Sequence, residues 1–112
     1  MTHFITFQGV PMDLPKVYKQ FLEDKVEIGE AYRSLGHAIH HAGPLNERER
    51  TLVKLGIAMG ARLEGGVHSQ VRKALDAEIE PDEIRHAAVL GITTLGFPAS
   101  MANLSWVEDI LK

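Results

Sequence analysis

Apolar residues recur at helical spacing along most of this chain, and this periodicity constrains the fold more than any other feature. Val17, Phe21, Ile28, Tyr32 and Leu35 follow one another in this way. Apolar residues that repeat every three to four positions form one face of an amphipathic helix. Strand-like alternation is confined to the N-terminal stretch. The sequence therefore predicts an all-α fold.

Glycine and proline divide the predicted helices. A first helix is predicted from Asp13, as its N-cap, through Pro15 in the first turn to about His41, where Gly43 and Pro44 end it. Asn46 and a glutamate three residues later have the spacing of a capping box, which predicts a second helix ending near residue 60. The remaining helices are predicted to begin near Gly65, at Pro81 and after Gly96, the one from Pro81 continuing through Ile92.

The length of 112 residues suits one domain. We therefore predict a single-domain helical bundle of about five helices over residues 13–112, preceded by an N-terminal extension over residues 1–12. Apolar residues make up 45% and charged residues 24%, which excludes a disordered chain. The net charge of −3 includes no basic excess and argues against nucleic acid as a partner. No secretory signal and no apolar run of about 18–20 residues is evident, so no membrane partner and a cytoplasmic location are expected.

The chain contains no cysteine, which is its most informative feature for function. A disulfide, a thiolate nucleophile and a cysteine-ligated zinc ion are therefore all excluded.

Six histidines raise the question of a metal or acid–base site. His37 and His41 lie four residues apart, hence on one helix face, and so do Glu64 and His68. Brought together, the two pairs would offer imidazole and carboxylate ligands for zinc or iron. The alternative is that these are surface histidines near helix ends and an ordinary helical Glu–His pair. The expectation is no cofactor, with a His/Glu-bound metal as the alternative.

Glu64 and His68 are the predicted catalytic pair, with His68 as a general base and Glu64 orienting it. Arg72 follows at the same spacing and is a candidate for binding a ligand carboxylate, or for pairing with Glu64. Histidine suits proton transfer at neutral pH because its unperturbed pKa is about 6.5. The alternative is a polar cluster of purely structural or interface character.

The order of several segments resembles the carboxymuconolactone decarboxylase family, which includes the alkylhydroperoxidase D-like proteins. The segments that carry the resemblance are Leu45–Val53, Gln70–Leu75, Pro81–Ile84, Gly96–Ala99 and Trp106–Asp109. The resemblance implies an all-helical subunit of the alkylhydroperoxidase D-like fold that assembles with itself into trimers or hexamers.

The peroxidase branch of that family carries a Cys-x-x-Cys-x-x-x-His motif and a glutamate one helix earlier. The resemblance places the two cysteines at Leu63 and Gly66, the histidine at Gln70 and the glutamate at Thr51, so all four positions depart from the motif. The decarboxylase branch also has histidine at the position of Gln70. We therefore expect these four residues to line an inherited small-molecule pocket that lacks the thiol chemistry.

Two functions remain open from the sequence. The first is an oligomeric family member that binds a small molecule without redox turnover. The second is an enzyme whose acid–base or metal-assisted chemistry, decarboxylase- or lyase-like, has moved to Glu64 and His68. The sequence is compatible with both functions and does not establish that the protein is an enzyme.

Overall fold

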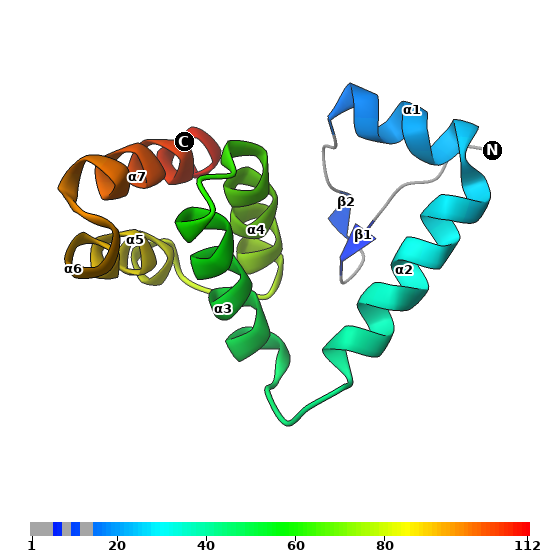
Figure 1. The fold of residues 1–112 in the computed structure, drawn as a ribbon, viewed down its shortest axis with the longest axis horizontal. Coiled ribbons are helices and arrows are strands. Elements are labelled where there is room, and N and C mark those ends of the chain that lie inside the picture. The colour runs from blue at the N-terminus through cyan, green and yellow to red at the C-terminus, as the bar shows by residue number, and fades with distance from the viewer. Residues whose placement is uncertain (1–5, 8–9, 12–14) are drawn as a thin grey trace. The chain divides into compact units, whose positions relative to one another are not determined.

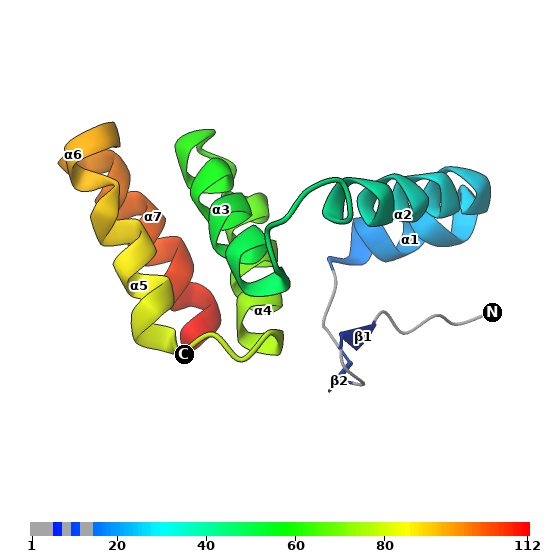
Figure 2. The same ribbon diagram turned by 90° about the horizontal axis from the view of Figure 1, so that it is seen from below.

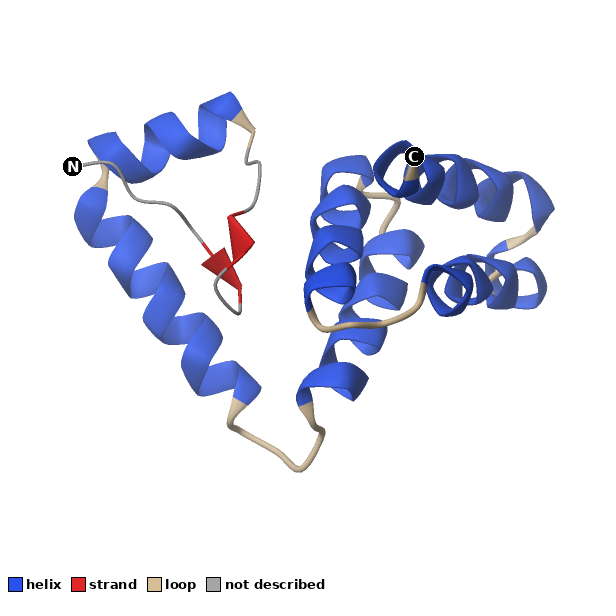
Figure 3. Cartoon of the chain, turned by 180° about the vertical axis from the view of Figure 1, so that it is seen from behind, coloured by secondary structure: helices blue, strands red, loops and turns tan. Residues whose placement is uncertain are grey.

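The computed structural model describes residues 6–7, 10–11 and 15–112. The chain forms two compact units, Met1–Pro44 and Leu45–Lys112, and each is described by itself. The all-α prediction is confirmed (Figure 3): apart from two short strands, the regular structure of the described residues is helical. None of the described helices is both long and apolar enough to cross a membrane. The predicted boundary after residue 12 stays a prediction.

The first unit contains a small hairpin and two helices. Strands β1 (Thr6–Phe7) and β2 (Val10–Pro11) pair antiparallel. Helices α1 (Lys16–Asp24) and α2 (Val26–His40) follow and pack against each other (Figure 1). The predicted N-cap, Asp13, lies outside the described residues.

The prediction of one continuous helix to about His41 is wrong, because the chain turns at Lys25. The backbone there has φ −123° and ψ 65°, which no helix accommodates. The turn brings the end of α1 against α2 at Gly29, which is buried. A Cβ atom on Gly29 would lie 2.9 Å from Leu22 Cδ2, so the absence of a side chain permits this approach. Helical periodicity continues across the turn, which hides it in the sequence.

The second unit is a bundle of helices in which α3 lies beside α4 and α5 beside α7 (Figures 1 and 2). Helix α4 also packs on α7, which joins the two pairs. The short helix α6 connects α5 to α7 and contacts both. The bounds of these helices are α3 Glu47–Gly60, α4 Glu64–Asp76, α5 Pro81–Leu90, α6 Ile92–Leu95 and α7 Phe97–Leu111.

Local capping explains where two of these helices begin. The Asn46 side chain accepts a hydrogen bond from the Glu49 backbone N–H, and the Glu49 carboxylate accepts one from the Asn46 N–H, which confirms the predicted capping box. Pro81 occupies the first turn of α5, as predicted. The Glu83 carboxylate closes a second capping box on the backbone of Glu80.

Ile92 does not extend the helix that begins at Pro81. That helix, α5, ends at Leu90, and Ile92 begins α6. Gly91 lies between them, where a Cβ atom would be 3.0 Å from Ser100 Oγ of α7. The close approach of α7 at Gly91 favours a change of chain direction over continuation of α5.

The core of the second unit lies between its four long helices. Its fully buried side chains come from each of them and form one cluster: Leu55 of α3, Val67 and Val71 of α4, Ile84 of α5 and Val107 of α7. Trp106, the lone tryptophan, is half-buried and packs against this cluster. The cluster therefore fixes the register of α4 against α7.

Gly66 lies in the first turn of α4, where the helix packs closely against Leu63 and Ala58. A Cβ atom there would lie 3.1 Å from Leu63 Cβ and 3.4 Å from Ala58 Cβ, whereas one on Gly65 has no described atom within 4 Å. We expect Gly66→Leu to destabilise the fold by about 1–3 kcal/mol through overpacking. Gly65→Leu is the matched control and should gain up to about 1 kcal/mol of helix propensity. Thermal unfolding measures both, and equal melting temperatures for the two variants would show that Gly66 is incidental.

Asp76, the last residue of α4, is expected to make the stability of the fold depend on pH. Burial and, secondarily, the nearby Glu47 raise the pKa of the Asp76 carboxyl, whose Oδ1 is shielded from solvent without a hydrogen bond. A raised pKa in the folded state means that protonation favours folding, and this contribution is lost as the pH rises through the folded-state pKa. A carboxylate at a helix C-terminus is also unfavourable to the helix dipole.

We therefore expect Asp76→Asn to raise the free energy of unfolding at pH 7, with the gain shrinking as the pH falls through the raised folded-state pKa and largely lost by about pH 3, below the ordinary carboxyl value. Urea unfolding at the two pH values measures the difference. Asp24→Asn, at the exposed last residue of α1, is the control for loss of a charge at a helix end. A gain in Asp76→Asn that does not depend on pH would contradict the assignment.

Candidate functional site

The candidate site lies where α4 begins, directly after a tight turn from α3. Arg62 adopts the left-handed conformation, with φ 60°. The Leu63 N–H donates to Ala58 O at 3.1 Å and the Arg62 N–H donates to Met59 O at 3.2 Å. These two bonds form a Schellman motif that ends α3. Leu63 then serves as the N-cap of α4, so Glu64 is its first helical residue.

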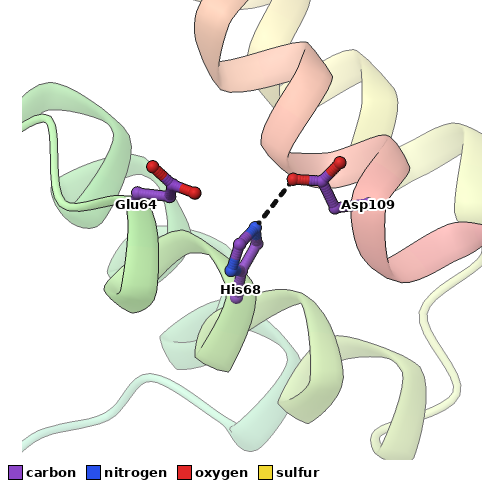
Figure 4. Close-up of side chains that lie close together, drawn as sticks. All are labelled: Glu64, His68 and Asp109. Atoms are coloured by element: carbon purple, nitrogen blue, oxygen red, sulfur yellow. Dashed lines mark hydrogen bonds and ion pairs between the residues drawn. The ribbon is translucent and has the colours of Figure 1, made fainter.

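Three polar side chains of this region converge: Glu64 and His68 of α4 and Asp109 of α7 (Figure 4). His68 Nε2 lies 3.1 Å from Asp109 Oδ2. One ligating atom from each of the three side chains lies within 4.8 Å of the other two. The His68 side chain is 21% exposed and that of Asp109 56%, so the imidazole is partly sheltered and the carboxylate is open to solvent.

Packing between α4 and α7 holds these side chains in place. His68 follows Val67, and Asp109 lies two residues after Val107, and both valines are fully buried in the core. At the neighbouring residue of α7, the Glu108 carboxylate accepts a hydrogen bond from Arg85 Nε at 2.7 Å. That bond lowers the pKa of Glu108 below its usual value and ties α7 to α5. The backbone beneath the cluster is therefore fixed from two sides.

A cation–π contact borders the cluster. The Arg62 guanidinium lies 5.3 Å from the centre of the Trp106 ring, which links the α3–α4 turn to α7. Because Trp106 is one turn from Asp109 and Arg62 two residues from Glu64, this contact joins the two segments that carry the carboxylates. The contact is a further link between α7 and the residues just before α4.

The sequence around this site matches a known protein family. A sequence profile of the carboxymuconolactone decarboxylase family matches residues 27–109. The chain belongs to this family. The match includes Glu64, His68 and Asp109 and extends over α3 to α6. No curated protein and no solved structure matches the chain.

The four positions at which the family's peroxidase motif was expected lie on α3 (Thr51), at the N-cap of α4 (Leu63) and within α4 (Gly66 and Gln70), and they offer no thiol and no acid–base group. Thr51 Oγ1 donates to Glu47 O at 2.8 Å, within its own helix. Leu63 is exposed, and Gly66 lies against it closely enough that a Cβ would touch its side chain. Gln70 is half-buried one helical turn beyond Gly66. Their role in binding a small molecule stays a prediction.

The predicted pair Glu64 and His68 meets within one cluster, but the hydrogen-bond partner of the imidazole is Asp109, whose carboxylate accepts from His68 Nε2. Asp109 was missed as a site residue because it is 41 residues from His68 in the sequence. The only sequence signal for it is its place at the end of the family segment Trp106–Asp109. Arg72 is half-buried on α4. Among the described residues it forms no ion pair, so the alternative that it pairs with Glu64 is not seen in the structure.

His37 and His41, the predicted metal pair, lie at the end of α2 in the first unit. Their ring centres are 4.2 Å apart, and His41 Nδ1 is hydrogen-bonded to His37 O at 2.9 Å. That bond engages one of the two ring nitrogens of His41. A metal bound by His37 and His41, alone or together with Glu64 and His68, stays a prediction.

Proposed function

We propose that this family member transfers protons on a small carboxylic acid at His68, without thiol chemistry and as a homo-oligomer. The observation that carries the proposal is the bond of 3.1 Å between His68 Nε2 and Asp109 Oδ2. A carboxylate bound to one imidazole nitrogen fixes the tautomer and orientation of the ring and stabilises its protonated form. The other nitrogen, Nδ1, is then the group that exchanges a proton with the substrate.

The family name supports the class of substrate and reaction. In a decarboxylation, the bond to the departing CO₂ breaks, the electron pair stays on the substrate, and a protonated His68 supplies the proton that replaces the carboxyl group. Arg72, two turns along α4 from Glu64, is the proposed partner for a second carboxylate of the substrate. Asp109 acts through His68 and is a positioning residue.

Replacement of His68 tests this proposal. On a panel of small carboxylated lactones and β-keto acids, His68→Gln should lower the turnover by about 10²–10⁴-fold, the usual contribution of an acid–base group. His86→Gln is the matched control, because His86 is exposed on α5. Asp109→Asn should retain part of the activity with a changed pH profile, because the ring loses its orienting charge. Unchanged turnover in His68→Gln would refute the proposal.

Binding without turnover is the second candidate function. The exposure of Glu64 and Asp109 favours it, because a site open to water weakens electrostatic contributions to catalysis. A panel compound that binds to the wild type and not to Arg72→Met, with no product formed, would support this function over the first.

The proposed homo-oligomer is supported by apolar surface on α2. Ile28, Tyr32, Leu35 and Ile39 recur at helical spacing, and each is more than half exposed. Among the described residues of α1 and α2, the one buried residue is Gly29, so this pair of helices contains no large buried side chain. Helices without a buried apolar face are unstable in water, which favours burial against a second copy of the chain.

Sedimentation equilibrium tests the assembly. We expect three or six times the chain mass of 12.4 kDa. Leu35→Glu should shift the equilibrium toward smaller species because it places a charge in the apolar stripe, whereas Ser34→Glu, at the adjacent exposed residue, should leave the mass unchanged. A stable monomer of the wild type at micromolar concentration would overturn the proposal.

A further inference from the structure

The Glu64, His68 and Asp109 cluster also has the composition of a metal site. We propose that these three side chains bind a divalent transition-metal ion of the zinc class. They offer one imidazole nitrogen and two carboxylate oxygens, the donors that zinc accepts when no thiolate is present. Three protein ligands leave a fourth position for water or a substrate oxygen, as in catalytic rather than structural zinc sites.

The spacing of the donors suits such an ion. Bonds of about 2.0–2.1 Å to a tetrahedral zinc place its ligand atoms roughly 3.4 Å apart. His68 Nε2 and Asp109 Oδ2 are 3.1 Å apart, so this pair needs little adjustment. The spacing within the whole group is at most 4.8 Å, and Glu64 is exposed at the start of α4, so its side chain can rotate toward the ion without movement of the backbone.

Charge favours the same ion. Two carboxylates face one imidazole, and no lysine or arginine among the described residues forms an ion pair with Glu64 or Asp109. Carboxylates held this close repel each other, and a divalent cation between them converts the repulsion into attraction. The packing of Val67 and Val107 in the core keeps α4 and α7 at this separation, so the repulsion is relieved by rotation of the side chains or by a bound cation and not by separation of the helices.

Metal binding and the proposed proton transfer use His68 differently. An ion on Nε2 takes the place of the proton shared with Asp109, so the loaded site would exchange protons through the metal-bound water instead of the imidazole. The inference concerns the site of the proposed function, but it needs no substrate to be tested. A failure of metal binding would leave proton transfer by His68 intact, and a failure of turnover would leave metal binding measurable.

Calorimetric titration of the untagged full chain with Zn²⁺ at neutral pH tests the inference. We expect one ion per chain and no comparable binding of Mg²⁺, which prefers oxygen ligands in octahedral geometry. Glu64→Gln, His68→Gln and Asp109→Asn should each weaken Zn²⁺ binding at least about tenfold, since even residues behind metal ligands have effects of that size. His86→Gln is the control, because His86 is exposed on α5 outside the cluster, and it should bind Zn²⁺ as the wild type does.

Glu64 and Asp109 are exposed, and their amide variants have nearly the same shape as the wild-type side chains. We therefore expect Glu64→Gln and Asp109→Asn to fold as the wild type does, so that a loss of binding reports on the metal site. Substitution of Co²⁺ should give the visible absorption of a four-coordinate ion in the wild type and lose it in these two variants. Three outcomes would each overturn the inference: no Zn²⁺ binding by the wild type, wild-type affinity in all three ligand variants, or binding that is lost in the double variant His37→Gln/His41→Gln but kept in the three ligand variants.

Discussion

Replacement of Leu55 by alanine is expected to destabilise the second unit by about 2–5 kcal/mol. Leu55 lies on α3 and is fully buried among the apolar side chains of α4, α5 and α7. Truncation removes apolar contacts and leaves a cavity that the surrounding helices fill only in part. Because small domains are stable by only about 5–15 kcal/mol, a loss of this size is a large share of the total.

Ile57→Ala on the same helix is the matched control. Ile57 is 63% exposed, so its truncation should cost far less. Urea unfolding monitored by circular dichroism measures both variants. If Ile57→Ala were as destabilising as Leu55→Ala, the exposed face of α3 would be buried in the assembled protein, and the comparison should then be repeated at concentrations that dissociate it.

No thiol-dependent peroxidase activity is expected, which is a complete loss relative to the peroxidase branch of the family. Peroxide reduction by a thiol begins with thiolate attack on the peroxide oxygen and proceeds through a second cysteine to a disulfide. The chain has no cysteine at any position. Methionine sulfur forms a sulfoxide instead, which needs a separate reductase in each cycle. The protein is therefore expected to consume no organic hydroperoxide above the blank in an assay coupled to a dithiol.

Restoring the two thiols should not restore the activity. Leu63→Cys/Gly66→Cys lacks a proton acceptor at Gln70 and a carboxylate at Thr51, whose hydroxyl is bonded to Glu47 O. A Cβ atom at position 66 also lies only 3.1 Å from the Cβ atom of residue 63, a tight contact that the double variant keeps. Addition of Gln70→His and Thr51→Glu is expected to be required for turnover. Catalytic peroxide consumption by the wild type, or by the cysteine double variant alone, would contradict this account.

The helices could be predicted from the sequence because their signals are local. Apolar spacing predicts the helical faces, and Asn46 with Glu49 marks the start of α3 through atoms three residues apart. Pro81 marks the start of α5 in the same way. The turn at Lys25 and the end of α5 at Leu90 were missed. A close approach between helices favours each of them: Leu22 of α1 lies against Gly29, and Ser100 of α7 lies against Gly91. Contacts of this kind form between helices and leave no pattern within one helix.

In the candidate site, too, one part follows from local sequence and another part only from tertiary packing. Glu64 and His68 are four residues apart on one helix, so helical geometry alone places them on one face, and the sequence determined that pair. Asp109 joins them because α7 packs on α4 through the buried Val67 and Val107, and the bond of Arg85 to Glu108 ties the same part of α7 to α5. Burial of apolar surface acts between segments far apart in the sequence and has no local signature. Only the tertiary structure therefore decided that a second carboxylate faces His68, the arrangement from which proton transfer and metal binding are both proposed.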